Sequence, residues 1–150
     1  NIMKHEDWMR LALVQAERAY ELDEVPIGAV LIYNGQILAA GHNKKEQTQD
    51  PTAHAEIMVI REAAEKLGHW RLTDTTLYVT LEPCPMCAGA IVQARIKNLV
   101  FGASDAKSGA VESVTKILKP NLWNHTVNVT AGILEQECSD ILKKYFRLKR

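Results

Sequence analysis

The sequence predicts an α/β domain in which helices cover both faces of a mixed five-stranded sheet, a three-layer α/β/α sandwich. Five short apolar stretches are strand-like, and segments with helical spacing of apolar residues lie between most of them. Asn34-Gly35 joins the first two strands and is typical of a tight β-hairpin. Because this hairpin pairs two strands antiparallel, the sheet is mixed. A length of 150 residues suits a single domain, 1–150.

The strands are expected at residues 27–33, 36–41, 75–80, 98–103 and 126–132. Amphipathic or apolar spacing predicts helices at residues 4–22, 53–67, 84–96 and 133–148, with a short one at 114–119. Residues 42–52 form a polar loop. Asp50 or Thr52 is expected to cap the start of the second helix, and Gly68 to end it.

Composition excludes several classes of protein. The longest apolar stretch, at residues 27–33, is too short to cross a bilayer, and the first ten residues show no secretory signal. Three cysteines are an odd number for a disulfide framework. Two of them are close in sequence, and Cys138 is expected to be an inert thiol. We therefore expect a reducing, cytoplasmic compartment.

The net charge is zero, but the charges are unevenly distributed. The last ten residues hold five cations and no acid, so the preceding 140 residues carry a net charge of −5. A basic tail can meet phosphates. Charge alone favours a simpler interpretation, because cations are favourable at helix C-termini.

Cys84-Pro85-Met86-Cys87 is the strongest local motif. Two thiols three residues apart, at the start of a helix, suit a redox pair, half of a structural zinc site or part of a catalytic metal centre. A redox pair is expected directly after the first strand, whereas this motif follows the third. A structural zinc site needs four protein ligands, and a second cysteine pair is absent from the sequence.

His54 supplies a third ligand at the predicted start of another helix. One histidine and two cysteines leave the fourth position of a tetrahedral zinc ion open, which is typical of a catalytic site. Glu56 lies two residues further on, where its side chain suits a proton shuttle better than a ligand. Taken alone, Glu56 would be a first-turn glutamate stabilised by the helix dipole. The combination predicts a catalytic zinc centre.

The pattern His54-Ala55-Glu56 followed by Pro83-Cys84-x-x-Cys87 is the one known from zinc-dependent nucleobase deaminases. Nearly the whole chain, from about Trp8 onward, resembles the bacterial tRNA-specific adenosine deaminases. The resemblance implies a cytidine deaminase-like fold, one zinc ion per subunit, a homodimer, and conversion of the wobble adenosine of a tRNA anticodon to inosine. His54, Cys84 and Cys87 would hold the zinc, and Glu56 would move protons.

The same resemblance implies substrate contacts. Asn43 would contact a flipped nucleoside, Asp105, Lys107 and Asn124 would line the RNA path, and Phe146 with the basic tail would touch the anticodon stem-loop. Without it, Asn43 and Asn124 would be turn residues and Asp105 a cap. One stretch differs from the family, which often has Ala-Gly-Ser where Val111, Glu112 and Ser113 stand. Glu112 brings a negative charge near the expected phosphate path.

Two other functions share this zinc core. A deaminase of free cytosine, cytidine or guanine is the first, and the basic tail argues for a polymer substrate instead. An engineered deaminase of adenine in single-stranded DNA is the second, and few substitutions separate it from an RNA enzyme. A binding module with a structural zinc is disfavoured because a fourth protein ligand is lacking.

Overall fold

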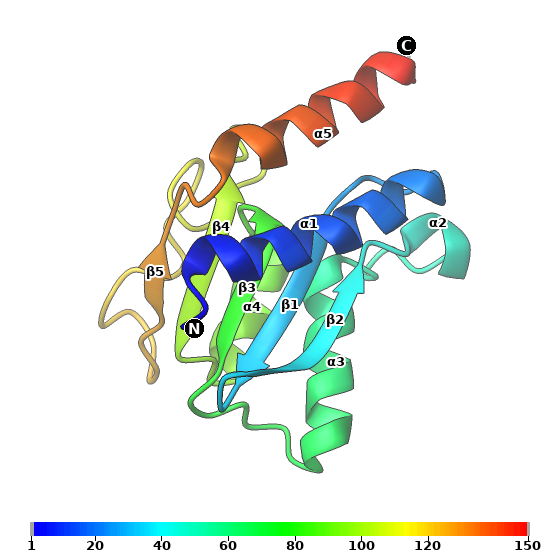
Figure 1. Cartoon of the computed structure of the whole chain (residues 1–150). Helices are drawn as coiled ribbons and strands as arrows, with labels where there is room; N and C mark the ends of the chain where they lie inside the picture. The colour runs from blue at the N-terminus through cyan, green and yellow to red at the C-terminus, as the bar shows by residue number, and fades with distance from the viewer. Residues whose placement is uncertain (1, 150) are drawn as a thin grey trace.

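Five strands form one mixed sheet in the computed structural model, which describes residues 2–149 (Figure 1). The strands are β1 (Gly28–Tyr33), β2 (Gln36–His42), β3 (Thr76–Leu81), β4 (Asn98–Ala103) and β5 (Asn128–Thr130). Their order in the sheet is β2-β1-β3-β4-β5. β1 pairs antiparallel with β2 and β3, whereas β3, β4 and β5 run parallel. The predicted mixed sheet is confirmed.

The helices are α1 (His5–Glu21), α2 (Lys45–Thr48), α3 (Ala55–Leu67), α4 (Pro85–Gln93) and α5 (Glu135–Leu148). α1 and α5 cover one face of the sheet, and α3 and α4 cover the other (Figure 1). Alternation along β1 explains both layers: Val30 and Ile32 belong to the core beneath α1, whereas Ala29 and Leu31 belong to the core beneath α3 and α4. The predicted three-layer fold is thus confirmed.

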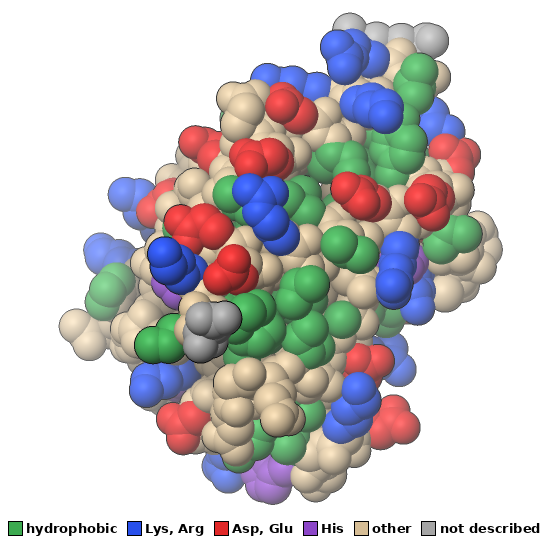
Figure 2. All heavy atoms as spheres, viewed as in Figure 1, with side chains coloured by type: hydrophobic (Ala, Val, Ile, Leu, Met, Phe, Trp, Pro, Cys, Tyr) green, Lys and Arg blue, Asp and Glu red, His purple; other side chains and the backbone are tan. Residues whose placement is uncertain are grey.

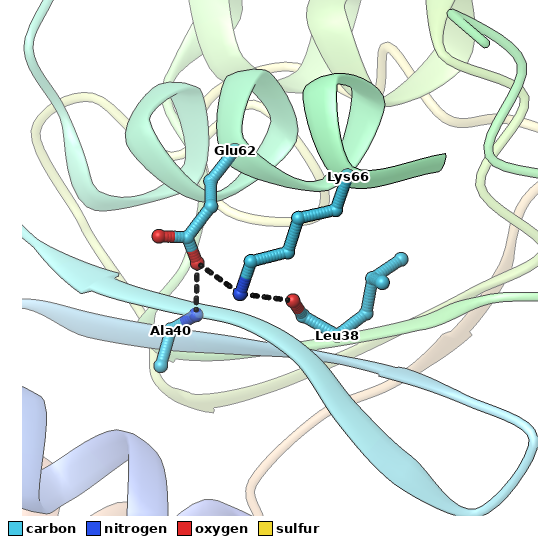
Figure 3. Close-up of polar contacts among 4 residues, drawn as sticks. All are labelled: Leu38, Ala40, Glu62 and Lys66. Carbon is cyan, nitrogen blue, oxygen red and sulfur yellow. Dashed lines mark hydrogen bonds and ion pairs between the residues drawn. The ribbon is translucent and has the colours of Figure 1, made fainter. Parts of the chain in front are cut away.

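The hairpin turn forms as expected, since Asn34 and Gly35 have φ angles of 52° and 73°. Polar contacts then tie α3 to the outer strand β2 (Figure 3). The Glu62 carboxylate accepts the N–H of Ala40 at 3.1 Å, and Lys66 donates to the carbonyl of Leu38 at 3.0 Å. Glu62 and Lys66 also form an ion pair at 3.6 Å.

Several local expectations were wrong. Residues 114–119 form a bend and a turn instead of a short helix, and the N–H groups of Val114 and Thr115 donate back to the carbonyl of Gly109. The loop at 42–52 contains the short helix α2. His54 is the N-cap of α3, while the Asp50 carboxylate accepts the N–H and hydroxyl of Thr52 within the loop.

Two elements are shorter than expected. α4 ends at Gln93 rather than at residue 96, because Arg95 adopts a positive φ of 63° and turns the chain toward β4. β5 keeps only Asn128–Thr130 of the strand predicted at 126–132. None of the helices formed by residues 2–149 combines the length and the hydrophobicity that a membrane crossing requires.

Candidate metal centre

Three side chains meet where two helices begin. His54 is the N-cap of α3, Cys84 is the N-cap of α4, and Cys87 lies in the first turn of α4. Their ligand atoms all lie within 4.8 Å of one another. The Nδ1 atom of His54 is 3.5 Å from the sulfur of Cys84 and 3.5 Å from that of Cys87. These three residues therefore form a group that can hold a metal ion.

The backbone explains why the ligands meet here. β2, β3 and β4 run in the same direction, so their carboxyl ends lie at one edge of the sheet, where open α/β sheets place their sites. The chain passes from the end of β3 directly into α4, with Cys84 as the cap and Pro85 as the first helical residue. Proline suits this position because its missing N–H would have no intrahelical partner.

The two thiols differ in their electrostatics. A hydrogen bond from the Cys87 thiol lowers the pKa of Cys84 to about 4. Burial opposes this shift, and His54 adds to it. That hydrogen bond to Cys84, together with burial, raises the pKa of Cys87. The hydrogen bond with Cys84 also raises the pKa of His54. A bound cation favours the deprotonated form of both thiols, which makes metal binding compete with protons.

Glu56 lies beside this group without joining its ligand atoms. Its side chain is 4% exposed, and its carboxyl contacts the Cys87 thiol. Burial raises the pKa of Glu56 to about 7. Cys87 is also buried, whereas His54 and Cys84 are partly exposed. His54 and Cys84 are therefore the members of the group that solvent reaches.

Asn43 is close to the same helix start. It follows β2 directly, is 4% exposed, and its side-chain oxygen accepts the N–H of Ala55 at 2.8 Å. Its own N–H donates to the carbonyl of Ile27. Asn43 is thus fixed next to His54, although it is buried and more constrained than the turn residue that its sequence context predicts.

The other residues predicted to contact substrate lie in three separate places. Asp105 accepts the N–H groups of Lys107 and Ser108, so its carboxylate caps its own turn. Lys107 is exposed on that turn. Asn124 is exposed and lines a cavity of about 290 Å³ against α4. Phe146 is 47% exposed on α5 and packs edge-to-face against Tyr145.

The basic tail is partly engaged with the rest of the chain. Lys149 forms an ion pair with Asp23, and Tyr145 donates to the carbonyl of that residue at 3.3 Å. Lys and Arg side chains gather around the end of α5, whereas acidic and basic groups are mixed over α1 (Figure 2). Arg150, the last cation of the tail, lies outside the described residues.

Two buried carboxylates were missed by the sequence analysis. Glu82 is 2% exposed and accepts hydrogen bonds from a loop about 30 residues further along the chain. Burial opposes its ionisation, but hydrogen bonds from Ser113, Glu112 and Asp105 outweigh burial and lower its pKa to about 2. Glu24 is 1% exposed and accepts the N–H groups of two residues in α2. The only sequence signal for Glu82 was its position between a buried strand and the Pro83-Cys84 motif.

The sequence is similar to those of known deaminases. The sequence model of the MafB19-like deaminases matches residues 3–150. The chain is 50% identical to the tRNA-specific adenosine deaminase of Bacillus subtilis, over 93% of this chain and 87% of that protein. It is 51% identical to the enzyme of that name from Agrobacterium fabrum, over 95% and 94%.

The fold is also similar to those of solved deaminase structures. One from a study of A-to-I editing by tRNA:A34 deaminases is 51% identical, with a TM-score of 0.87 over 90% of this chain and 98% of that one. A guanine deaminase from Bacillus subtilis is 32% identical, with a TM-score of 0.67 over 97% and 95%. The fold, the metal-binding group and these similarities agree that the chain belongs to the deaminase family that contains the tRNA-specific adenosine deaminases.

Proposed function

We propose that this protein is a zinc-dependent hydrolytic deaminase that converts adenosine to inosine at the wobble position of a tRNA anticodon. The observation that carries the proposal is the group of one histidine and two cysteines with the buried carboxyl of Glu56 beside it. The choice of substrate is supported by sequence identities of 50% and 51% to tRNA-specific adenosine deaminases from two bacteria.

The donor set fits zinc. Imidazole and thiolate ligands suit this ion, which binds sulfur at about 2.3 Å and nitrogen at about 2.0 Å in tetrahedral geometry. Those bond lengths put a nitrogen and a sulfur ligand about 3.5 Å apart. The measured separations from His54 Nδ1 to both sulfurs are 3.5 Å. We therefore infer one zinc ion per subunit, held by His54, Cys84 and Cys87.

When bound, the ion activates a water molecule for attack at neutral pH. In our proposal Glu56 would act as the base, taking a proton from the attacking water as the water oxygen adds to C6 of the adenine. Glu56 would deliver that proton to N1, then take the proton of the new C6 hydroxyl and give it to the amino group. The C6–N bond breaks, ammonia leaves, and the base becomes hypoxanthine. A pKa of about 7 suits a group that must both accept and donate protons.

Asn43 is proposed to orient the nucleoside. Its side-chain oxygen is engaged by the Ala55 N–H, which fixes the amide plane and leaves the NH₂ group as the donor for a substrate. A base stacked in an anticodon loop is inaccessible to such a site, so the nucleotide must be flipped out. Asp105, Lys107, Asn124, Phe146 and the basic tail are proposed to contact the remaining RNA.

Assembly and compartment are also proposals. The family resemblance implies a homodimer, and the exposed side chains of Leu122 and Trp123, at 50% and 52%, are apolar surface for a second copy to cover. Sedimentation equilibrium tests this assembly. Cys84, Cys87 and Cys138 are free thiols, which favours the reducing cytoplasm.

The function is tested by offering three substrates in parallel: an anticodon stem-loop RNA, single-stranded DNA of the same sequence, and free nucleosides and bases. We expect inosine in the RNA, at the first anticodon position. Deamination of free guanine or cytidine alone would favour the free-base alternative, which the similarity to guanine deaminases keeps as the second candidate. Equal activity on the DNA would favour an adenine deaminase adapted to DNA.

A further inference from the structure

We propose that Glu82 is a positioning residue that holds the loop of residues 105–113 against the metal centre, so that this loop is preformed for RNA. The inference rests on the proposed function, because the RNA is the substrate that the loop would meet. Glu82 stands two residues before the ligand Cys84, yet its side chain points into the loop and not toward the metal-binding group.

A single carboxylate collects five hydrogen bonds. One oxygen accepts the N–H of Asp105 at 3.0 Å and the hydroxyl of Ser113. The other accepts the N–H groups of Val111, Glu112 and Ser113 at 3.1, 2.8 and 2.9 Å. With the side chain only 2% exposed, these donors replace water as the partners of a buried charge. Both ends of the loop are thus tied to one point.

The backbone brings the loop against the metal motif. The N–H of Ala110 donates to the carbonyl of Pro83 at 2.9 Å, and the N–H of Glu82 donates to the carbonyl of Ala103 at 2.8 Å. Gly109 makes the close approach possible, because a Cβ there would lie 2.4 Å from the Cδ of Glu82. The loop is therefore packed on the segment that presents the two cysteines.

Glu82 contacts mainly the backbone of the loop, so side chains of the loop remain available for RNA. The carboxylate binds the backbone N–H group of residue 112, so this contact does not depend on the exposed side chain at that position. Glu112 can therefore stand at this position without disturbing the anchor. The exposed side chains of Lys107 and Glu112 point away from the anchor and form the loop surface that a polyanion would meet.

Loss of the anchor need not unfold the domain. Ala110 and Val111 are buried in the core beneath α3 and α4, so the base of the loop keeps its packing without the carboxylate. In a Glu82→Gln variant the amide oxygen can still serve the three N–H groups of residues 111–113, and the NH₂ group then faces the N–H of Asp105 and repels it. Part of the loop then detaches while the cysteines and the core remain in place.

The test compares Glu82→Gln with wild type by three readouts. Hydrogen exchange should accelerate most at the amide of Asp105, which loses its acceptor, and less at the amides of residues 111–113, whose acceptor changes from charged to neutral. The metal content should stay at wild-type level. The KM for anticodon stem-loop RNA should rise by about tenfold or more, while kcat stays within about threefold. Glu62→Gln is the matched control, since Glu62 also accepts a backbone N–H but does so two turns along α3 from the metal-binding group (Figure 3).

Ser113→Ala is a milder second variant that removes the hydroxyl donor and keeps the backbone donors. It should change exchange and KM in the same direction by a smaller factor. Unchanged loop exchange in both variants, or a loss confined to metal content, would overturn the proposal. An equal fall in thermal stability and kcat with constant KM would show a merely structural role. If wild-type protein fails to deaminate RNA, the proposed function is wrong, while the exchange data still report whether Glu82 holds the loop.

Discussion

Glu56 and the three ligands have separable roles within one site. The three ligands would each donate a lone pair to the same metal ion, whereas the buried Glu56 contacts the group from outside it. Removing a ligand should therefore remove both metal and activity. Removing Glu56 should remove only the proton transfer.

Glu56→Ala is expected to keep about one metal ion per chain and to lose activity by about 10²- to 10⁴-fold, the range of general acid–base catalysis. Cys87→Ala is expected to lose both. Elemental analysis of the purified variants and single-turnover inosine formation measure the two effects. Near-normal turnover in Glu56→Ala would refute the shuttle role.

The site residues that could be predicted from the sequence are those marked by a motif of neighbouring residues. His54, Cys84 and Cys87 stand at recognisable helix starts with ligand spacing, and the structure brings them together. Glu82 and Glu24 carry no comparable signal, because what buries each of them is a segment that lies 22 or more residues away in the sequence. Acidic residues are usually exposed, so sequence alone favours the opposite environment.

At the scale of elements, the short helix α2 depends on a distant acid. The carboxylate of Glu24 accepts the N–H groups of Glu46 and Gln47 at 3.0 and 2.7 Å, which are donors at the start of a helix. The prediction of a polar loop at 42–52 missed α2, because the acid that accepts its first N–H groups comes from outside the segment. α2 also follows Asn43 closely, so its order bears on the entrance to the site.

Glu24→Gln should loosen α2 by about 1–2 kcal/mol, since one charge-assisted acceptor is lost. Faster hydrogen exchange at the amides of Glu46 and Gln47, with unchanged exchange in β3, would report this effect. Glu17→Gln, on the exposed side of α1, is the control. Identical α2 exchange in both variants would show that Glu24 contributes nothing to the helix.

The core that α1 and α5 form with the sheet should contribute less to the stability of the fold at alkaline pH. Burial raises the pKa of Tyr78 and of Cys138 to about 12 in each case. Both groups are neutral in the fold, so their contribution is complete below their unfolded pKa values, about 10 for Tyr and 8.5 for Cys, and is lost as the pH rises toward 12.

Free energies of unfolding measured by urea denaturation from pH 8 to 12 should therefore fall across this window, by about 2 kcal/mol from Tyr78. In Tyr78→Phe the free energy of unfolding should fall less steeply with pH above about pH 10. This variant also loses the 2.7 Å contact with His5. Tyr33→Phe, at the half-buried end of β1, is the comparison. An unchanged slope in Tyr78→Phe would exclude ionisation of Tyr78 as the cause.

For the whole molecule, the strands, the helices and their layers could be predicted from the sequence, whereas the paths of the long loops between them could not. Strand and helix periods are local, so the layers and the hairpin followed from patterns such as Asn34-Gly35. Residues 104–127 lack such a pattern, because their path is decided by Glu82, Gly109 and other contacts distant in sequence. The predicted helix at 114–119 failed for that reason.

The charge distribution predicts how RNA binding should respond to salt. Affinity for anticodon stem-loop RNA should fall linearly on a log–log plot against salt concentration, because bound cations displace counterions. Arg147→Gln, in the last turn of α5, should reduce the magnitude of that slope by up to about one unit. Lys66→Gln removes the same charge from the far end of α3 and should leave the slope unchanged. Equal slopes in all three proteins would exclude the tail from the RNA interface.

The central claim is that an open site of three ligands, completed by zinc, deaminates adenosine in RNA. Its most direct test is titration of zinc into metal-free protein while inosine formation in an anticodon stem-loop is measured by mass spectrometry. We expect activity to rise with added zinc and to saturate at about one ion per chain. Full activity without metal, or a chain that binds one zinc ion and forms no inosine in the RNA, would contradict the account.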